Sequence, residues 1–291
     1  VVVSGVPELV PHGDRIDNLK WGLDVTNMYT YWMRKMTFIA NSGGVPNEME
    51  QLNAGYRAAR YAEDPNFTRF SSWNGGNPVG QFEYLSGTPE LSKNFDDYDY
   101  TLENTMDAAD QRHDVTTRVV ISGTYTPNGF GSVATRNGGG ISFYYFKGNA
   151  IRVEAMRDMV NDRGQIPQEL RDAGLEQAIE NVLAWNPNAF NSPTASFSEG
   201  GINFYYQGVC YYTVLIRHFS NNMVPVLMGY GRYGVVRNNV YQLSINKIIG
   251  PGQPVINPPG TDPDDEDTSW ISADVNIMRW YIRNQNVEEL L

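Results

Sequence analysis

A proline-rich, acidic stretch near the C-terminus separates two strand-like parts of this chain. Residues 250–269 hold five prolines, and five of the six residues from 262 to 267 are acidic. Such a stretch buries little apolar surface, and its prolines favour extended backbone. We therefore expect residues 250–269 to form a tether between two folded segments.

The segment beyond the tether, residues 270–291, has the pattern of a donor-type strand. Apolar and polar side chains alternate from 271 to 277, and the apolar set then moves to even positions, which predicts a bulge or bend. A strand on a stiff tether favours pairing in another molecule. The residues expected to fill the partner's groove, and so to carry polymerisation, are Ile271, Ala273, Val275, Ile277, Trp280 and Ile282.

The alternative is an edge strand that folds back onto its own sheet. Sequential strands usually pair, which favours this alternative, whereas so long a structureless connection is unusual inside a compact domain. If the strand is a donor, we expect the chain without residues 270–291 to fold but not to polymerise.

Composition narrows the class of protein. Hydrophobic residues make up 41% of the 291, enough for a sizeable core, and charged residues only 19%, as in many extracellular β-proteins. The net charge of −11 and the lack of a Lys/Arg stripe argue against nucleic acid as a partner. No apolar run is long enough to predict a transmembrane helix.

Strand-like segments dominate the chain before the tether. They lie at 19–36, 115–125, 141–147, 202–207, 209–219 and 235–249, and the 202–207 and 209–219 segments look like a hairpin pair. Helical periodicity occurs at 150–162 and 168–184, and more weakly at 52–62. This order predicts that residues 1–249 form a mainly antiparallel β-sandwich, with a helical insertion at about 150–185 packed on one side.

We find no catalytic, cofactor-binding or metal-binding motif. Cys210 lies in an apolar strand-like run, which favours a buried, unreactive thiol. The acidic stretches 96–99 and 262–267 lack the spacing of a calcium loop, so solvated loops are the better interpretation. The histidines have no metal-ligand spacing: His12, His113 and His218. We predict no enzymatic activity. A pair of carboxylates that hydrolyses glycosides stays an open alternative, because the sequence does not give the distance between carboxylates.

Several segments together resemble the fimbrial subunits (type V pilins) of Bacteroidales, closest to the minor-fimbrium shaft subunit. The segments that carry the resemblance are 102–106, 116–127, 236–249 and the ending 280–290. The resemblance implies a transthyretin-like or Greek-key pilin domain. It also implies that this chain corresponds to the C-terminal domain of such a subunit.

The resemblance further implies how such a subunit is assembled. These subunits are exported as outer-membrane lipoprotein precursors, and an arginine-directed protease removes an N-terminal strand to open a groove. The C-terminal strand of one subunit then fills the groove of the next, head to tail, in a cell-surface fimbria that serves adhesion and colonisation. The expected partners are identical or homologous pilin subunits, with a host protein or glycan receptor as a further candidate.

Two other functions stay open from sequence. The first is a carbohydrate-binding surface protein or tip adhesin, in which exposed aromatic residues such as Trp73, Tyr98 and Tyr100 stack on sugars. The second, less favoured, is a secreted glycoside-active enzyme fragment. Binding to a glycan array would separate them from a purely structural subunit.

Overall fold

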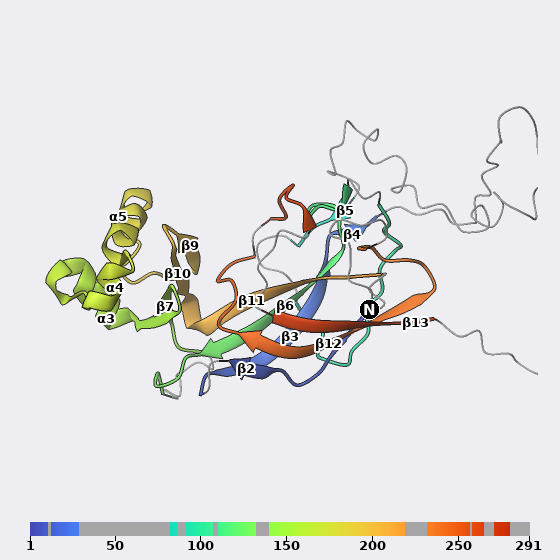
Figure 1. Ribbon diagram of the computed structural model, residues 1–291, viewed down its shortest axis with the longest axis horizontal. Helices are drawn as coiled ribbons and strands as arrows, with labels where there is room; N and C mark the ends of the chain where they lie inside the picture. The colour runs from blue at the N-terminus through green and yellow to red at the C-terminus, as the bar shows by residue number, and fades with distance from the viewer. Residues whose placement is uncertain are drawn as a thin grey trace, which may run out of the picture.

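The fold is mainly β, with one helical lobe at an end (Figure 1). The computed structural model describes residues 1–10, 13–28, 82–85, 91–106, 110–131, 140–218, 232–256, 258–264 and 271–279. The predicted helix at 52–62 lies outside these residues, as do His12, Trp73, Trp280 and Ile282.

The first sheet is built around one long central strand. Its members are β1 (Val2–Ser4), β2 (Glu8–Val10), β12 (Asn239–Ile249) and β13 (Ile271–Arg279). β1 and β2 pair with β12 in parallel, and β13 pairs with its other edge antiparallel. Gly5, between β1 and β2, has φ of 106°, and a Cβ there would lie 2.5 Å from the carbonyl oxygen of Ile245. Glycine therefore lets this connection cross close to β12.

The second sheet is wholly antiparallel. Its strands, in the order β11-β6-β3, are β11 (Val209–Leu215), β6 (Arg118–Thr126) and β3 (Arg15–Asp24). Five of the nine residues of the central strand β6 are β-branched and six are buried, in keeping with the preference of β-branched residues for a packed pleated surface. The short strands β4 (Thr26–Asn27) and β5 (Phe82–Glu83) form a separate two-stranded ribbon after β3.

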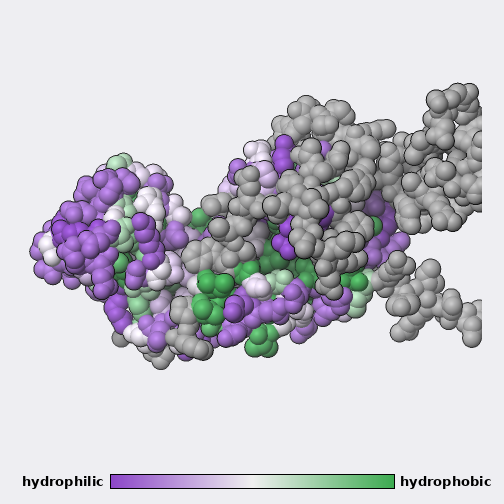
Figure 2. Space-filling view, in the orientation of Figure 1, coloured by the Kyte–Doolittle hydropathy of each residue, from purple (hydrophilic) through white to green (hydrophobic). Residues whose placement is uncertain are grey.

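The two sheets enclose one apolar core, so the predicted β-sandwich is confirmed. Alternate side chains of β12 and β6 point inward from opposite sides and meet aromatic residues of β3 and β11. Fully buried members of this core include Trp21, Ile121, Tyr125, Tyr212, Leu243 and Ile248. Figure 2 shows hydrophobic side chains gathered over the sandwich, whereas hydrophilic ones dominate the helical end.

The helices belong to a separate lobe and do not pack on a face of the sandwich. They are α3 (Val153–Asn161), α4 (Gln168–Asp172) and α5 (Leu175–Trp185). They cover a four-stranded sheet of β8 (Asn149–Arg152), β7 (Phe143–Phe146), β10 (Ile202–Tyr205) and β9 (Phe197–Glu199). This lobe has its own core, in which Met156, Leu175 and Ile179 are fully buried. The expectation of helices on one side of the sandwich is therefore wrong.

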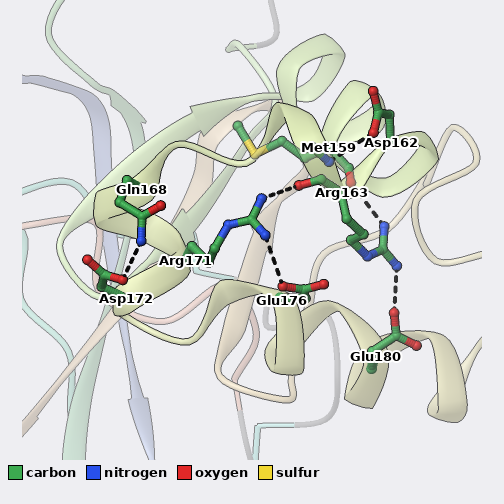
Figure 3. A network of polar contacts seen from close by, with 9 residues as sticks. Met159, Asp162, Arg163, Gln168, Arg171, Asp172, Glu176 and Glu180 are labelled. Atoms are coloured by element: carbon green, nitrogen blue, oxygen red, sulfur yellow. Dashed lines mark hydrogen bonds and ion pairs between the residues drawn. The ribbon is translucent and has the colours of Figure 1, made fainter.

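Two arginines hold the helical lobe together (Figure 3). Arg163 donates to the carbonyl oxygens of Met159 and Val160 at the end of α3, and also to Glu180 of α5 at 2.8 Å. Arg171 of α4 donates to the carbonyl oxygen of Arg163 at 2.6 Å. These bonds satisfy carbonyls that a helix end leaves without partners, so the network is structural.

Local boundaries differ from the sequence prediction in two places. Residues 150–152 are strand, and the predicted helix at 168–184 is broken at Gly174, which has φ of 91°. The 202–207 and 209–219 segments do not form a hairpin pair, because β10 pairs with β7 and β9 while β11 pairs with β6. Gln207 and Gly208 have positive φ and turn the chain from one sheet to the other.

Candidate polymerisation strand

The predicted donor strand, β13, lies in its own chain at the edge of the first sheet. It pairs antiparallel with β12. Asn239 is opposite Arg279 at one end of the ladder, and Ile248 is opposite Ile271 at the other. No strand pairs with the other edge of β13 among the residues that the structure describes. The arrangement is the fold-back that the sequence left open as the alternative.

The two faces of β13 differ as the alternation predicts. Ile271 is 7% exposed, and Ala273, Val275 and Ile277 are half-buried against the sandwich core. Ser272, Asp274 and Asn276 on the opposite face are exposed. Four of the six predicted polymerisation residues therefore share one apolar face, while Trp280 and Ile282 lie outside the described residues.

The bulge in this strand pair is in β12 rather than in β13. The register shifts between Ile245 and Lys247, so Asn246 is the extra residue, and its side chain donates to Asp274 at 2.7 Å. In β13 the alternation continues through Met278, which faces outward and is 41% exposed. The expected phase change at Met278 thus produces no bulge in the described part of β13.

The first part of the predicted tether is docked on the second sheet. Gln253 forms a two-way backbone bridge with Tyr211 of β11, at 2.8 and 2.9 Å. Tyr205 and Tyr212 donate their hydroxyls to the carbonyl oxygens of Gly252 and Gly250. Buried tyrosine hydroxyls need such acceptors, so they fix the chain here. Residues 250–253 of the expected tether therefore lie against the folded domain.

A second anchor lies at residues 262–264. Pro263 forms a bridge with Arg112, and the backbone N–H of Asp264 donates to the carbonyl oxygen of Gln111 at 3.1 Å. The Asp264 side chain is 2% exposed and accepts a hydrogen bond of 2.5 Å from the Thr116 hydroxyl. We call these contacts of 262–264 with 111–116 the clasp. Asp262 is exposed, in keeping with the solvated-loop interpretation, whereas Asp264 is buried and departs from it.

The docked tail changes the expected effect of truncation. Removing residues 270–291 would take away Ile271 and the half-buried residues of β13, and would open one edge of β12. Burying a large aliphatic side chain contributes about 1.5–3 kcal/mol, so the loss is large beside a typical domain stability of about 5–15 kcal/mol. The packing of β13 therefore indicates that this strand contributes to the stability of the isolated chain, and the expectation that the chain folds without residues 270–291 stays a prediction.

The groups beneath and around β13 are arranged for packing rather than chemistry. Tyr241 of β12 accepts from the backbone N–H of Val236 and is hydrogen-bonded to His218, and burial lowers the pKa of that histidine. Complete burial raises the pKa of Cys210 to about 12, which confirms the buried thiol and leaves no reactive thiolate near neutral pH.

The ranges that the structure describes contain neither a metal-binding cluster nor a membrane-spanning helix. No group of three or more histidine, cysteine or carboxylate side chains in these ranges is placed to hold a metal ion. None of the helices seen in the structure has the length and apolarity needed to cross a membrane.

Comparison with known proteins identifies the C-terminal region. Residues 203–286 match the family model described as major fimbrial subunit protein type IV, fimbrillin, C-terminal, a range that runs from β10 through the tether and β13. A search of curated proteins finds no match. The expected resemblance to a fimbrial subunit and its C-terminal domain is confirmed, while the minor-fimbrium shaft type stays a prediction. Over residues 203–286 this chain is therefore similar to the C-terminal part of fimbrillin, a major fimbrial subunit.

Proposed function

We propose that this chain is a structural, non-enzymatic subunit of a cell-surface fimbria and that it polymerises by donor-strand exchange through β13. The observation that carries the proposal is the position of β13, the last described strand of the chain, at the edge of the first sheet. One face is apolar and turned to the core, and the other is polar and exposed. A strand of this kind can supply both backbone hydrogen bonds and alternate side chains to a second subunit.

In the exchange, β13 leaves the β12 of its own chain and fills a groove of the next subunit. The interactions that β13 gives up and those that it forms are of the same kind, namely a backbone ladder and an apolar face, so the net change in free energy is small. The gross cost of lifting Ile271, Val275 and Ile277 from the core is on the order of 5 kcal/mol. Exchange therefore needs a vacant groove on the partner and is slow without one.

The family match supports the proposal because it includes both β12 and β13. The resemblance supplies the rest: export as an outer-membrane lipoprotein precursor, opening of the groove by an arginine-directed protease, and a role in adhesion and colonisation. Repeated head to tail, an interface between unlike surfaces gives a filament instead of a closed ring.

Electron microscopy of the full-length, protease-processed protein tests the proposal. We expect filaments from the unaltered protein and none from Val275→Asp, because a carboxylate on the inward face cannot enter an apolar groove. Asn276→Asp, which adds the same charge on the exposed face, is the matched control and should still assemble. Filaments of normal length from Val275→Asp would show that β13 is not the donor.

A further inference from the structure

A pocket of about 650 Å³ lies between the second sheet and the segment that returns from β5. Its walls come from three places: the end of β3 with β4, the strand β5 with the two residues after it, and residues 92–93 with 99–102. The aromatic and charged residues of the lining are Trp21, Glu83, Tyr84, Lys93, Asp99 and Tyr100. Volumes of this size are usual for small-molecule sites.

A buried ion pair fixes one wall of this pocket. Asp24, 1% exposed, accepts from Arg118 at 2.7 Å and from the backbone N–H of Leu85 at 2.8 Å. The Tyr84 hydroxyl donates to the carbonyl oxygen of Asp114 at 2.8 Å, which sets the plane of its ring. This wall is held before any ligand arrives, so little ordering is required on binding.

The aromatic side chains have different accessibilities. Trp21 is fully buried in the sandwich core, and its indole N–H donates to the carbonyl oxygen of Asn94. Tyr100 is 78% exposed at the rim, although it is a large side chain with an apolar ring. An exposed tyrosine beside a preformed pocket provides a flat surface on which an apolar ring face can stack. Tyr98, 61% exposed on the same segment, does not line the pocket.

The polar groups of the lining narrow the class of ligand. Lys93 and Asp99 oppose each other at 3.6 Å, and Glu83 adds a second, exposed carboxylate. Thr26, Ser92 and Thr101 add hydroxyls. The excess of carboxylate disfavours an anion, and Lys93 disfavours a cation. A purely apolar ligand would strip water from these groups without replacing its hydrogen bonds.

We propose that this pocket binds a neutral oligosaccharide, with Tyr100 stacking on one sugar ring and Glu83 and Asp99 accepting hydrogen bonds from sugar hydroxyls. Neutral sugars offer both an apolar ring face and many hydroxyls, which is the combination that the lining presents. The inference does not depend on strand exchange, since no described residue of β12 or β13 lines the pocket.

The test uses an array of neutral hexose and N-acetylhexosamine oligosaccharides, together with their sialylated counterparts. The full chain should bind at least one neutral member, and titration calorimetry should then show an affinity about tenfold lower for Tyr100→Ala. Tyr98→Ala is the matched control, because it removes an exposed tyrosine from the same segment outside the pocket, and its affinity should be unchanged. Glu83→Gln should weaken binding less than Tyr100→Ala does.

Three results would overturn the proposal. They are the absence of binding to every neutral glycan, equal or stronger binding of the sialylated counterparts, and equal effects of Tyr98→Ala and Tyr100→Ala. Both tyrosines are exposed, so the variants should melt at the temperature of the parent chain, and circular dichroism checks this.

Discussion

Locking β13 to its own β12 with a disulfide separates the two roles of this strand. Gln242 and Asn276 are directly opposite in the register and lie on the face away from the core. Opposite residues of an antiparallel pair have Cα atoms about 4.5–5.5 Å apart, within the range that a disulfide spans. The variant Gln242→Cys/Asn276→Cys should therefore form the bond without moving the backbone. Cys210 is fully buried with a raised pKa, so it does not compete.

The expected size of the effect follows from the loop that the bond closes, from residue 242 to residue 276. Chain entropy predicts a gain of up to about 4 kcal/mol in the free energy of unfolding. For a domain of this size, the melting temperature should then rise by roughly 10 °C in the oxidised protein relative to the reduced protein. Calorimetry of the two forms measures the difference.

The disulfide that raises stability should prevent assembly. The oxidised protein cannot release β13, so processed subunits should give no filaments by electron microscopy, and adding a reductant should restore them. A control lock, Ser198→Cys/Asn203→Cys, joins β9 to β10 in the helical lobe, where the two residues are also paired. It should assemble in both redox states. Filaments from the oxidised β12–β13 lock would refute the assignment of β13 as donor.

Three further changes test the packing argument. Ile271→Asp should lower the free energy of unfolding by several kcal/mol in urea titration, since the side chain is 7% exposed, whereas Ser272→Asp on the exposed face should change it little. Asp264→Ala should cost about 1.5–3 kcal/mol, because it removes a hydrogen bond to a buried carboxylate, and a cost near zero would contradict the clasp. Burial lowers the pKa of His218 from 6.5, so the unfolded chain binds this proton first, and stability should fall as pH drops below 6.5. A His218→Gln variant should show a shallower fall over that range, and an unchanged slope would exclude His218 as a cause.

Periodicity predicted the faces of the elements well, because burial on one face is a local property of the sequence. The alternation from Ile271 to Ile277 and the apolar stripe of α5 are both seen in the structure. Periodicity does not show which other element each buried face packs against. β10 and β11 are adjacent in sequence, yet Gln207 and Gly208 send them to different sheets. The separate helical lobe was missed for the same reason.

Composition predicted a tether over the whole of residues 250–269, because it describes the stretch as one unit and does not show which of its residues contact the domain. Proline and acid content favours extended backbone, but such backbone can also form a bridge to a sheet edge, as Gln253 does with Tyr211. Asp264 is a carboxylate that sequence statistics place in solvent, yet it is buried and accepts a hydrogen bond from Thr116, which is distant in the sequence. The pocket could not be predicted from the sequence either, since its walls come from segments far apart in the chain.

The clasp has a consequence for how far β13 can travel during exchange. With the clasp closed, Ile271 can lie at most about 25 Å from Asp264, because each residue spans at most about 3.6 Å. With the clasp open and only Gln253 anchored, the limit rises to about 60–65 Å. A neighbouring domain is itself about 30 Å across, so a groove on its far side is within reach only after the clasp opens. Asp264→Ala should therefore speed filament growth even though it lowers stability, whereas an unchanged rate would place the acceptor groove within the shorter distance.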